Sequence, residues 1–313
     1  MTIRRRGQPI HGWIVLDKPL GMSSAQAVAK LRRLFDAEKA GHGGTLDPLA
    51  TGILPIAFGE ATKTVAWAMN GLKTYRFTVR WGEQRDTDDA EGKIIATSDY
   101  RPDRDEIATI LPRFTGTIQQ RPPDFSALKL AGDRAYELAR KGQIVDLAVR
   151  DVTIHSLVLL NPSTDAPPDP DRAEFEAEVG KGTYIRALAR DLGEALGTKA
   201  SIATLRRTRV GPFRETQAIS LDNLASLGHS PAPSEYLLPI ETALDDIPAL
   251  ALTEAEASRL RCGQSVTPSG ALERARLLDL GDGQTVCVFC GAKLVALAET
   301  GAGALRPVRV LNH

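Results

Sequence analysis

One histidine, His42, and one carboxylate, Asp47, stand in the glycine-rich stretch GHGGTLDPLATG at residues 41–52. A carboxylate can serve as a nucleophile or as a general base. Glycosidases need a pair of carboxylates, and no second acid stands beside Asp47 in the sequence. Either Asp47 performs a reaction other than ordinary hydrolysis or it is structural, because aspartate before proline is common in turns.

Other catalytic motifs are missing from the sequence. It contains no G-x-x-x-x-G-K-[ST], no G-x-S-x-G and no H-E-x-x-H, and GHGGTL departs from G-x-G-x-x-G at its last position. Cys287 and Cys290 form a C-x-x-C, but the chain has only 3 cysteines and 5 histidines, so a zinc site has little support. Two alternate residues directed into a β core explain this pair better. We therefore expect no cofactor and no metal.

Charge is balanced overall but clustered locally. Lys+Arg and Asp+Glu both number 39, whereas residues 181–214 hold eight basic and two acidic residues, a net charge of +6. Such a cluster can mark a polyanionic partner. It can equally be a solvated face whose counter-charges lie elsewhere in the fold.

Regular hydrophobic patterns predict the elements that carry these residues. The apolar run at 12–16 indicates a buried strand, and a serine N-cap followed by an amphipathic pattern indicates a helix over 23–35. TYRFTVRW at 74–81 alternates strictly, with Tyr75 on the apolar face of a strand. The acidic stretch at 82–93 departs from a calcium-binding loop, and we expect a solvated hairpin or loop.

The clearest strand-turn-helix pattern covers residues 173–197. Apolar and acidic residues alternate in its first part, glycines end the strand, and apolar residues then recur at helical spacing. Arg186 and Arg190 are four residues apart, so both should project from one side of the helix.

The composition changes after residue 245. Segments rich in proline and small polar residues at 161–170 and 228–234 indicate connectors. The tail from about residue 246 shows one helix candidate, at 253–263, and short strand-like runs that predict a small β domain. No apolar run approaches the ~20 residues that cross a bilayer, and the first residues lack the pattern of a signal peptide, so a cytoplasmic location is expected.

The segment AGHGGTLDPLATGILPIAFGEATK closely resembles the signature of the TruB-type tRNA pseudouridine synthases. These enzymes isomerise the T-loop uridine of tRNA, at tRNA position 55. Four further segments match the family in the expected order and extend the resemblance over roughly residues 10–215: GWIVLDKPLGMSS, KTYRFTVRWGEQRDTDDAEG, FSALKLAGDRAYELARKG and KGTYIRALARDLGEALGTKASIATLRRTRVGPF.

The resemblance implies an α+β fold built on a mixed, largely antiparallel sheet with peripheral helices. It implies a catalytic domain over 1–245 with a tRNA-contacting insert at about 118–145. The tail, 246–313, resembles the small, β-barrel-like PUA-type RNA-binding domain only loosely. The expected partner is the T-arm stem-loop of tRNA, with no membrane and no metal, and the protein is expected to be monomeric.

The same resemblance assigns three catalytic positions. Asp47 matches the essential aspartate, Tyr75 the tyrosine that stacks on the target base, and Arg186 the arginine that pairs with the aspartate. Taken alone, Arg186 could brace its helix and Tyr75 could be an ordinary core residue. A single carboxylate suits this reaction, because the detached uracil is rejoined to the same sugar and no water has to be activated.

Three further residues match positions that contact the substrate. Tyr184 and Leu205 match pocket positions, and His42 matches the histidine that enters the RNA loop when the uridine leaves its stack. Two other functions stay open at this point. An RNA-binding or RNA-folding protein would need the basic cluster but not the carboxylate, and a hydrolytic enzyme would release free uracil.

Overall fold

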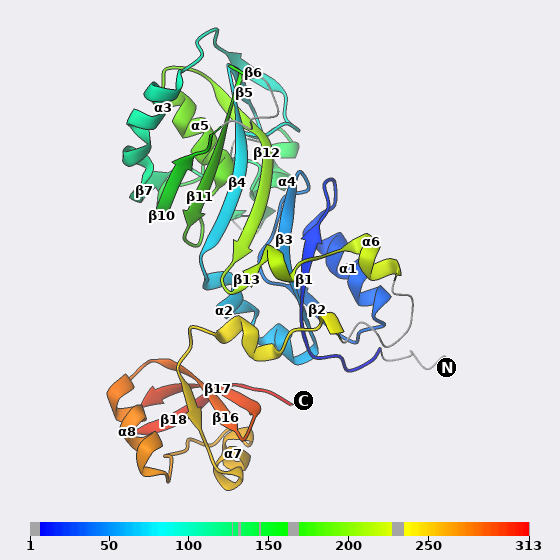
Figure 1. Cartoon of the computed structure of the whole chain (residues 1–313), viewed down its shortest axis with the longest axis vertical. Coiled ribbons are helices and arrows are strands. Elements are labelled where there is room, and N and C mark those ends of the chain that lie inside the picture. The colour runs from blue at the N-terminus through cyan, green and yellow to red at the C-terminus, as the bar shows by residue number, and fades with distance from the viewer. Residues whose placement is uncertain are drawn as a thin grey trace.

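The computed structural model describes residues 7–126, 128–130, 133–143, 145–161, 169–226 and 235–312 (Figure 1). One long sheet with helices along it forms most of the molecule, and a smaller sheet with two helices lies at the end where the C-terminus is found. The structure therefore confirms the α+β class. Within the described residues, no helix is both long and apolar enough to span a bilayer.

The large sheet is mixed and largely antiparallel, as expected. Its main path runs β14-β1-β3-β12-β4-β11-β10-β7, with β2 paired to β3 and β13 to β12. Two of its pairs are parallel, β1 with β14 and β12 with β3. The strands are β1 (Gly12–Lys18), β2 (Ala40–His42), β3 (Ala50–Phe58), β4 (Lys73–Trp81), β7 (Gly116–Gln120), β10 (Arg150–Leu159), β11 (Arg172–Val179), β12 (Ala200–Val210), β13 (Phe213–Arg214) and β14 (Ile219–Ser220).

Helices pack along this sheet. The predicted helix over 23–35 is present as α1, with Ser23 as N-cap in a capping box with Gln26. The helices of this part are α1 (Ser24–Leu34), α2 (Val65–Asn70), α3 (Arg104–Ile110), α5 (Ile185–Ala195) and α6 (Leu221–Ser226), with 3-10 turns η1 (Gly59–Lys63), η2 (Leu111–Phe114), η3 (Glu215–Gln217) and η5 (Ile240–Leu244).

Two hydrophobic clusters hold the helices that matter for the site. Helix α5 buries Leu188 and Leu192 against Phe77 and Phe175 of β4 and β11, whose rings stack at 5.4 Å. Helix α1 packs Leu31 and its neighbours against β1 and β3. Burial of these large apolar side chains is the main contribution that holds the two helices on the sheet. Helix α1 is thereby fixed against β1 and β3, and α5 against β4 and β11.

The acidic stretch at 82–93 forms the predicted hairpin, with β5 (Glu83–Arg85) paired to β6 (Ile94–Thr97). The expectation that it is solvated is wrong at its tip. Thr87, Asp88 and Asp89 are buried, and the N–H of Ile202 donates to the carbonyl of Asp88 at 3.0 Å. The tip lies against β12 and α5 because arginines of α5 pair with its carboxylates. The sequence does not show this pairing, because the partners are about 100 residues apart in the chain.

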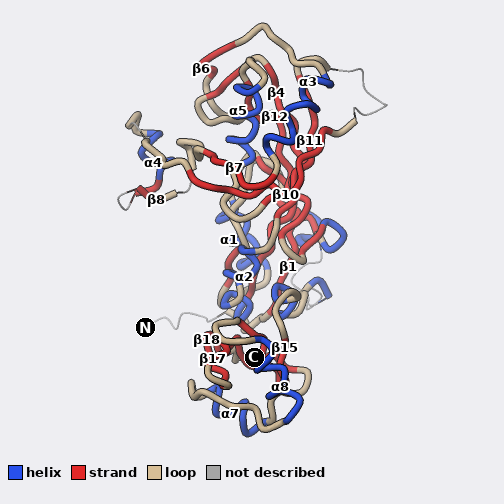
Figure 2. The backbone as a smooth tube through the Cα atoms, turned by 90° about the vertical axis from the view of Figure 1, so that its left-hand side faces the viewer, coloured by secondary structure: helices blue, strands red, loops and turns tan. Residues whose placement is uncertain are grey.

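The expected insert projects to one side of the large sheet (Figure 2). Residues 118–120 of the expected insert belong to β7 of the large sheet. Further along, the described residues form a short hairpin of β8 (Lys129–Leu130) and β9 (Asp133–Arg134), followed by α4 (Ala135–Arg140). Ala135, Val145 and Leu147 form a small cluster of their own. Residues 127, 131–132 and 144 of the insert, and most of the connectors expected at 161–170 and 228–234, lie outside the described residues.

The tail contains a four-stranded sheet in the order β15-β16-β17-β18. The expectation of a single helix there is wrong, because a second one follows the first. The second helix has no side-chain N-cap, and Leu272 and Leu278 are exposed, so no clean apolar stripe marks it. The elements are β15 (Ala249–Ala251), α7 (Glu254–Arg261), α8 (Ala271–Leu280), β16 (Thr285–Cys290), β17 (Lys293–Gly301) and β18 (Ala304–Val310).

The tail packs against the large sheet through a shared apolar cluster. Leu294 and Leu297 of β17 meet Trp13 of β1 and Val210 of β12 in that cluster. Lys63 Nζ donates to the carbonyl of Val310 at 2.8 Å. The two parts are therefore joined by core packing as well as by the chain.

The two cysteines of the C-x-x-C are not both buried. Cys287 is buried in that shared cluster, whereas the Cys290 thiol donates to a Glu254 carboxylate oxygen at 3.0 Å. All three cysteines are free. Among the described residues, no group of three or more His, Cys, Asp or Glu side chains could hold a metal ion.

Candidate active site

The loop that carries Asp47 has no regular structure, yet its backbone is held from several sides. Ser24, the first residue of α1, accepts from the N–H of Leu46 at 2.8 Å and donates to its carbonyl at 3.0 Å. Lys18 Nζ donates to the carbonyl of Pro48 at 3.4 Å. Buried polar groups are stable only when paired, so these contacts fix the loop on both sides of Asp47.

Arg207 of β12 completes this support. Its guanidinium donates to the carbonyls of Ile53, Thr45 and Gly44 at 2.8, 3.2 and 3.1 Å. The side chain is buried, at 1% exposed, and forms no ion pair with a carboxylate in the described part of the chain. Arg207 is therefore a positioning residue that holds the backbone before and after Asp47 through three carbonyls.

Two glycines of the motif are required by the backbone. Gly44 has φ +118°, a value that L side chains rarely adopt. Gly52 has φ +97°, and a Cβ placed there would lie 2.2 Å from the carbonyl oxygen of Arg207. The glycine-rich character of residues 41–52 thus allows β3 to approach β12 closely and the loop to turn toward Asp47.

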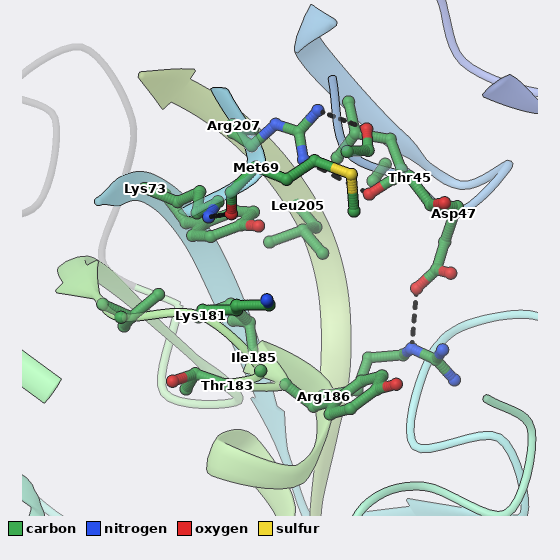
Figure 3. A pocket seen from close by; sticks show the side chains of 18 of the residues that line it. Thr45, Asp47, Met69, Lys73, Lys181, Thr183, Ile185, Arg186, Leu205 and Arg207 are labelled. Carbon is green, nitrogen blue, oxygen red and sulfur yellow. Dashed lines mark hydrogen bonds and ion pairs between the residues drawn. The ribbon is translucent and has the colours of Figure 1, made fainter. Parts of the chain in front are cut away.

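Arg186 lies at the start of α5 and is aimed at Asp47. Its Nη1 and Nη2 donate to the carbonyls of Thr87 and Phe125 at 2.8 and 3.0 Å. Its Nε lies 2.9 Å from Asp47 Oδ2, an ion pair in which the N–H is not directed closely enough at the oxygen for a hydrogen bond. Figure 3 shows this pair at one side of a cavity.

The two partners of this pair differ in exposure. The side chain of Arg186 is 6% exposed and that of Asp47 is 40% exposed. A guanidinium remains charged when buried, so the carboxylate is held beside a permanent positive charge while its open side faces the cavity. This geometry presents Asp47 to a bound molecule.

A second carboxylate, which the sequence around Asp47 does not reveal, shares Arg186. Asp89 Oδ2 lies 3.6 Å from Arg186 Nε. Its other oxygen accepts from Thr87 Oγ1 at 2.6 Å and from the N–H of Glu91 at 3.1 Å. The side chain of Asp89 is 10% exposed, against 40% for Asp47, so Asp47 is the more accessible carboxylate of the two.

One turn further along α5, Arg190 fastens the same acidic tip. Its Nη1 lies 3.0 Å from Asp88 Oδ2, and its Nη2 donates to the carbonyl of Arg121 at 2.7 Å. Burial raises the pKa of Asp88 to about 6 although the Arg190 charge opposes the shift. The prediction that Arg186 and Arg190 project from one side is confirmed by their common contact with residues 87–88.

A cavity of about 390 Å³ adjoins the Asp47–Arg186 pair, a volume that suits a nucleotide-sized ligand. It brings together five of the six residues singled out from the sequence. Tyr75 comes from β4, Leu205 from β12, and Tyr184 from the residue before α5. The side chain of Gln120 holds Tyr184, accepting from its N–H at 2.8 Å, and the guanidinium of Arg150 lies over the Tyr184 ring at 5.1 Å.

The sixth residue, His42, lines a second cavity of about 640 Å³ instead. Asp47 and Arg186 line both cavities, and Tyr136 and Arg140 of the insert line the second. Burial and the nearby Arg207 charge lower the pKa of His42, which favours the neutral imidazole. The Asp47–Arg186 pair therefore lies where two cavities meet.

The sequence interpretation missed the residues that hold the site: Lys18, Ser24, Asp89, Gln120 and Arg207. The only available signal was that Lys18, Ser24, Asp89 and Arg207 fall inside segments that match the family. Their contacts join positions distant in the chain, so no local pattern marks them. Burial, opposed by the Asp47 charge, lowers the pKa of Lys18 to about 8.

We expect Arg207→Met to destabilise the protein by about 3 kcal/mol, because it leaves buried carbonyls of the Asp47 loop without donors. Urea denaturation measures the change. Arg206→Met is the matched control on the adjacent residue. Arg206 forms partly exposed ion pairs with Asp17 and Glu215, so its loss should cost less than about 1 kcal/mol. Equal losses for the two variants would contradict the positioning role of Arg207.

Comparison with known proteins identifies the family of the chain. Residues 32–185 match the model of the TruB family pseudouridylate synthase N-terminal domain, and residues 186–245 match that of the tRNA pseudouridylate synthase B C-terminal domain. A tRNA pseudouridine synthase B of Bradyrhizobium diazoefficiens is 57% identical over 99% of this chain and 88% of that protein. One of Rhodospirillum rubrum is 54% identical over 100% of both chains.

Solved structures agree on the fold. A chain of a Cbf5-Nop10-Gar1 complex matches with a TM-score of 0.70 and 28% identity over 92% of this chain and 78% of that one. A chain of an H/ACA RNP bound to a substrate RNA containing 2′-deoxyuridine has a TM-score of 0.71 at 23% identity, over 100% of this chain and 92% of that one. By family model and relatives alike, the protein belongs to the TruB family of pseudouridylate synthases.

Proposed function

We propose that the protein converts the T-loop uridine of tRNA, position 55, to pseudouridine. The observation that carries this proposal is the Asp47–Arg186 pair, 2.9 Å apart, with its carboxylate open to a nucleotide-sized cavity. The relatives named tRNA pseudouridine synthase B support tRNA as the substrate. Asp47 is the proposed catalytic residue, and the ion pair with Arg186 orients its carboxylate.

The reaction balances within the substrate. The bond between C1′ of the ribose and N1 of uracil breaks, the uracil turns, and C1′ then bonds to C5 of the same base. The proton on C5 leaves and N1 gains a proton, so no net oxidation and no hydrolysis take place. Asp47 can attack the sugar or the base, or remove a sugar proton, and each route uses one carboxylate. No cofactor is needed for this balance.

The lining of the smaller cavity suits a uracil. We propose that the base stacks on Tyr75, since base–aromatic stacking contributes ~1–3 kcal/mol, with Leu205 as the apolar wall and Tyr184 as a further contact. We propose that the Tyr75 hydroxyl takes part in proton transfer from C5. The rings of Tyr75 and Tyr184 and the side chain of Leu205 would shield the detached base from water.

The larger cavity suits the RNA around the target. Taking a uridine out of a folded loop costs a few kcal/mol, and His42 is proposed to fill the space that the uridine leaves. Tyr136 and Arg140 of the insert line the same cavity and would contact this RNA. We further propose that residues 1–245 are the catalytic domain, that 246–313 are a PUA-type RNA-binding domain, and that the protein acts as a cytoplasmic monomer.

Incubation with tRNA that carries tritium at uracil C5, with no cofactor added, tests the proposal. We expect release of one tritium per tRNA to water, and mapping of the product should place pseudouridine in the T-loop. A tRNA with cytidine at position 55 is the control and should release none. Release of free uracil would indicate hydrolysis, and label release from the control tRNA would contradict the proposed position.

A further inference from the structure

The smaller cavity has positively charged groups on the side away from Asp47 and Arg186 (Figure 3). Lys73 is the first residue of β4, and Lys181 follows β11 in the turn before α5. Lys73 Nζ donates to the carbonyls of Met69 and Gly71, and Lys181 Nζ donates to Asn70 Oδ1 at 3.0 Å. An ammonium has three N–H donors, so each lysine has capacity beyond these contacts.

No carboxylate compensates these charges within the described ranges of the chain. Lys73, Lys181 and Arg207 all line the cavity, and none of them forms an ion pair. Lys73 is only 8% exposed. Burial, together with the Arg207 and Lys181 charges, lowers the pKa of Lys73 to about 8. Such a cluster costs free energy in the empty protein, and a bound anion would remove that cost.

The position of the lysines relative to Tyr75 identifies the anion. Lys73 and Tyr75 are two residues apart on one strand, so both side chains lie on the same face, about 7 Å apart along it. The negative charges of an RNA are its phosphates, and a phosphate is separated from its base by one ribose. A base stacked on Tyr75 therefore brings a flanking phosphate to the lysines.

We propose that Lys73 and Lys181 form a phosphate subsite that binds a phosphate next to the flipped uridine. The subsite rests on the proposed function, because its ligand is the nucleotide whose base enters the cavity. It anchors the sugar-phosphate end of that nucleotide while the base is detached and turned against Asp47. Arg207 lines the same cavity and adds a third positive charge to it.

Equilibrium dialysis of radiolabelled uridine, uridine 5′-monophosphate and uridine 3′-monophosphate at fixed salt tests the subsite without requiring catalysis. We expect one monophosphate to bind the wild-type protein about tenfold more tightly than uridine, as expected for charge-assisted hydrogen bonds. In Lys181→Met and Lys73→Met this advantage should fall below about threefold, with uridine binding unchanged. Lys293→Met, an exposed lysine of β17, is the matched control and should keep the wild-type ratio.

Lys181→Met is the decisive variant, since Lys181 is exposed and contacts only an asparagine side chain among the interactions described, so its loss should not affect folding. Circular dichroism checks both variants. The subsite is contradicted if neither monophosphate binds better than uridine, or if the advantage persists in Lys181→Met. Failure of the proposed function looks different, because the wild-type protein would then leave the T-loop uridine of tRNA unconverted.

Discussion

The Asp47→Asn variant is expected to lose pseudouridine formation by about a thousandfold or more, while its affinity for tRNA stays within about threefold of the wild-type value. The substitution removes the nucleophilic and basic capacity of the carboxylate but little contact surface. Single-turnover conversion of tritiated tRNA and filter binding measure the two quantities. In an RNA-binding protein with an incidental cavity, the substitution would not lower pseudouridine formation selectively while leaving the tRNA affinity unchanged.

The structure also predicts that this variant folds. Asp89 lies 3.6 Å from Arg186 Nε, so the buried guanidinium keeps a negative partner when Asp47 is neutral. Asp17→Asn is the matched control, because Asp17 also pairs with an arginine, Arg206, but outside both cavities. We expect the control to keep activity within about threefold. Conversion of tRNA by Asp47→Asn at the wild-type rate would refute the catalytic assignment.

The second large effect is expected for Arg186→Lys, which should lower the rate of the chemical step about a hundredfold. Lysine keeps the charge but cannot donate to Thr87 and Phe125 and face Asp47 at the same time. A hundredfold loss corresponds to about 3 kcal/mol, in the range for damage to a buried ion pair. Because Arg186 is 6% exposed, tRNA affinity should change little.

The rate at saturating tRNA under single-turnover conditions is the measurement that separates these effects. Arg101→Lys is the control, since Arg101 pairs with Asp171 and donates to the carbonyl of Ser98 away from both cavities. It should leave the rate unchanged within about threefold. If Arg186→Lys instead weakened tRNA binding and kept the rate, Arg186 would be an RNA contact and not a partner of Asp47.

Much of the fold follows from local patterns in the sequence. The alternation at 74–81 predicts β4, the serine cap and apolar spacing predict α1, and the strand-turn-helix at 173–197 predicts β11 and α5. These signals are reliable because side-chain direction repeats every two residues in a strand and every 3.6 in a helix. Helix α8 escapes them because its exposed leucines interrupt the pattern.

The motifs also indicate which residues could act, because Asp47, Tyr75 and Arg186 fall in long segments that match one family. How these residues are held depends on contacts between strands that are distant in the chain. The fold brings Arg207 to the Asp47 loop, where it donates to the carbonyl of Gly44, 163 residues away in the chain. It also brings Asp89 beside Arg186. Such contacts depend on which strands pair, and pairing between distant strands leaves no periodic trace in the chain.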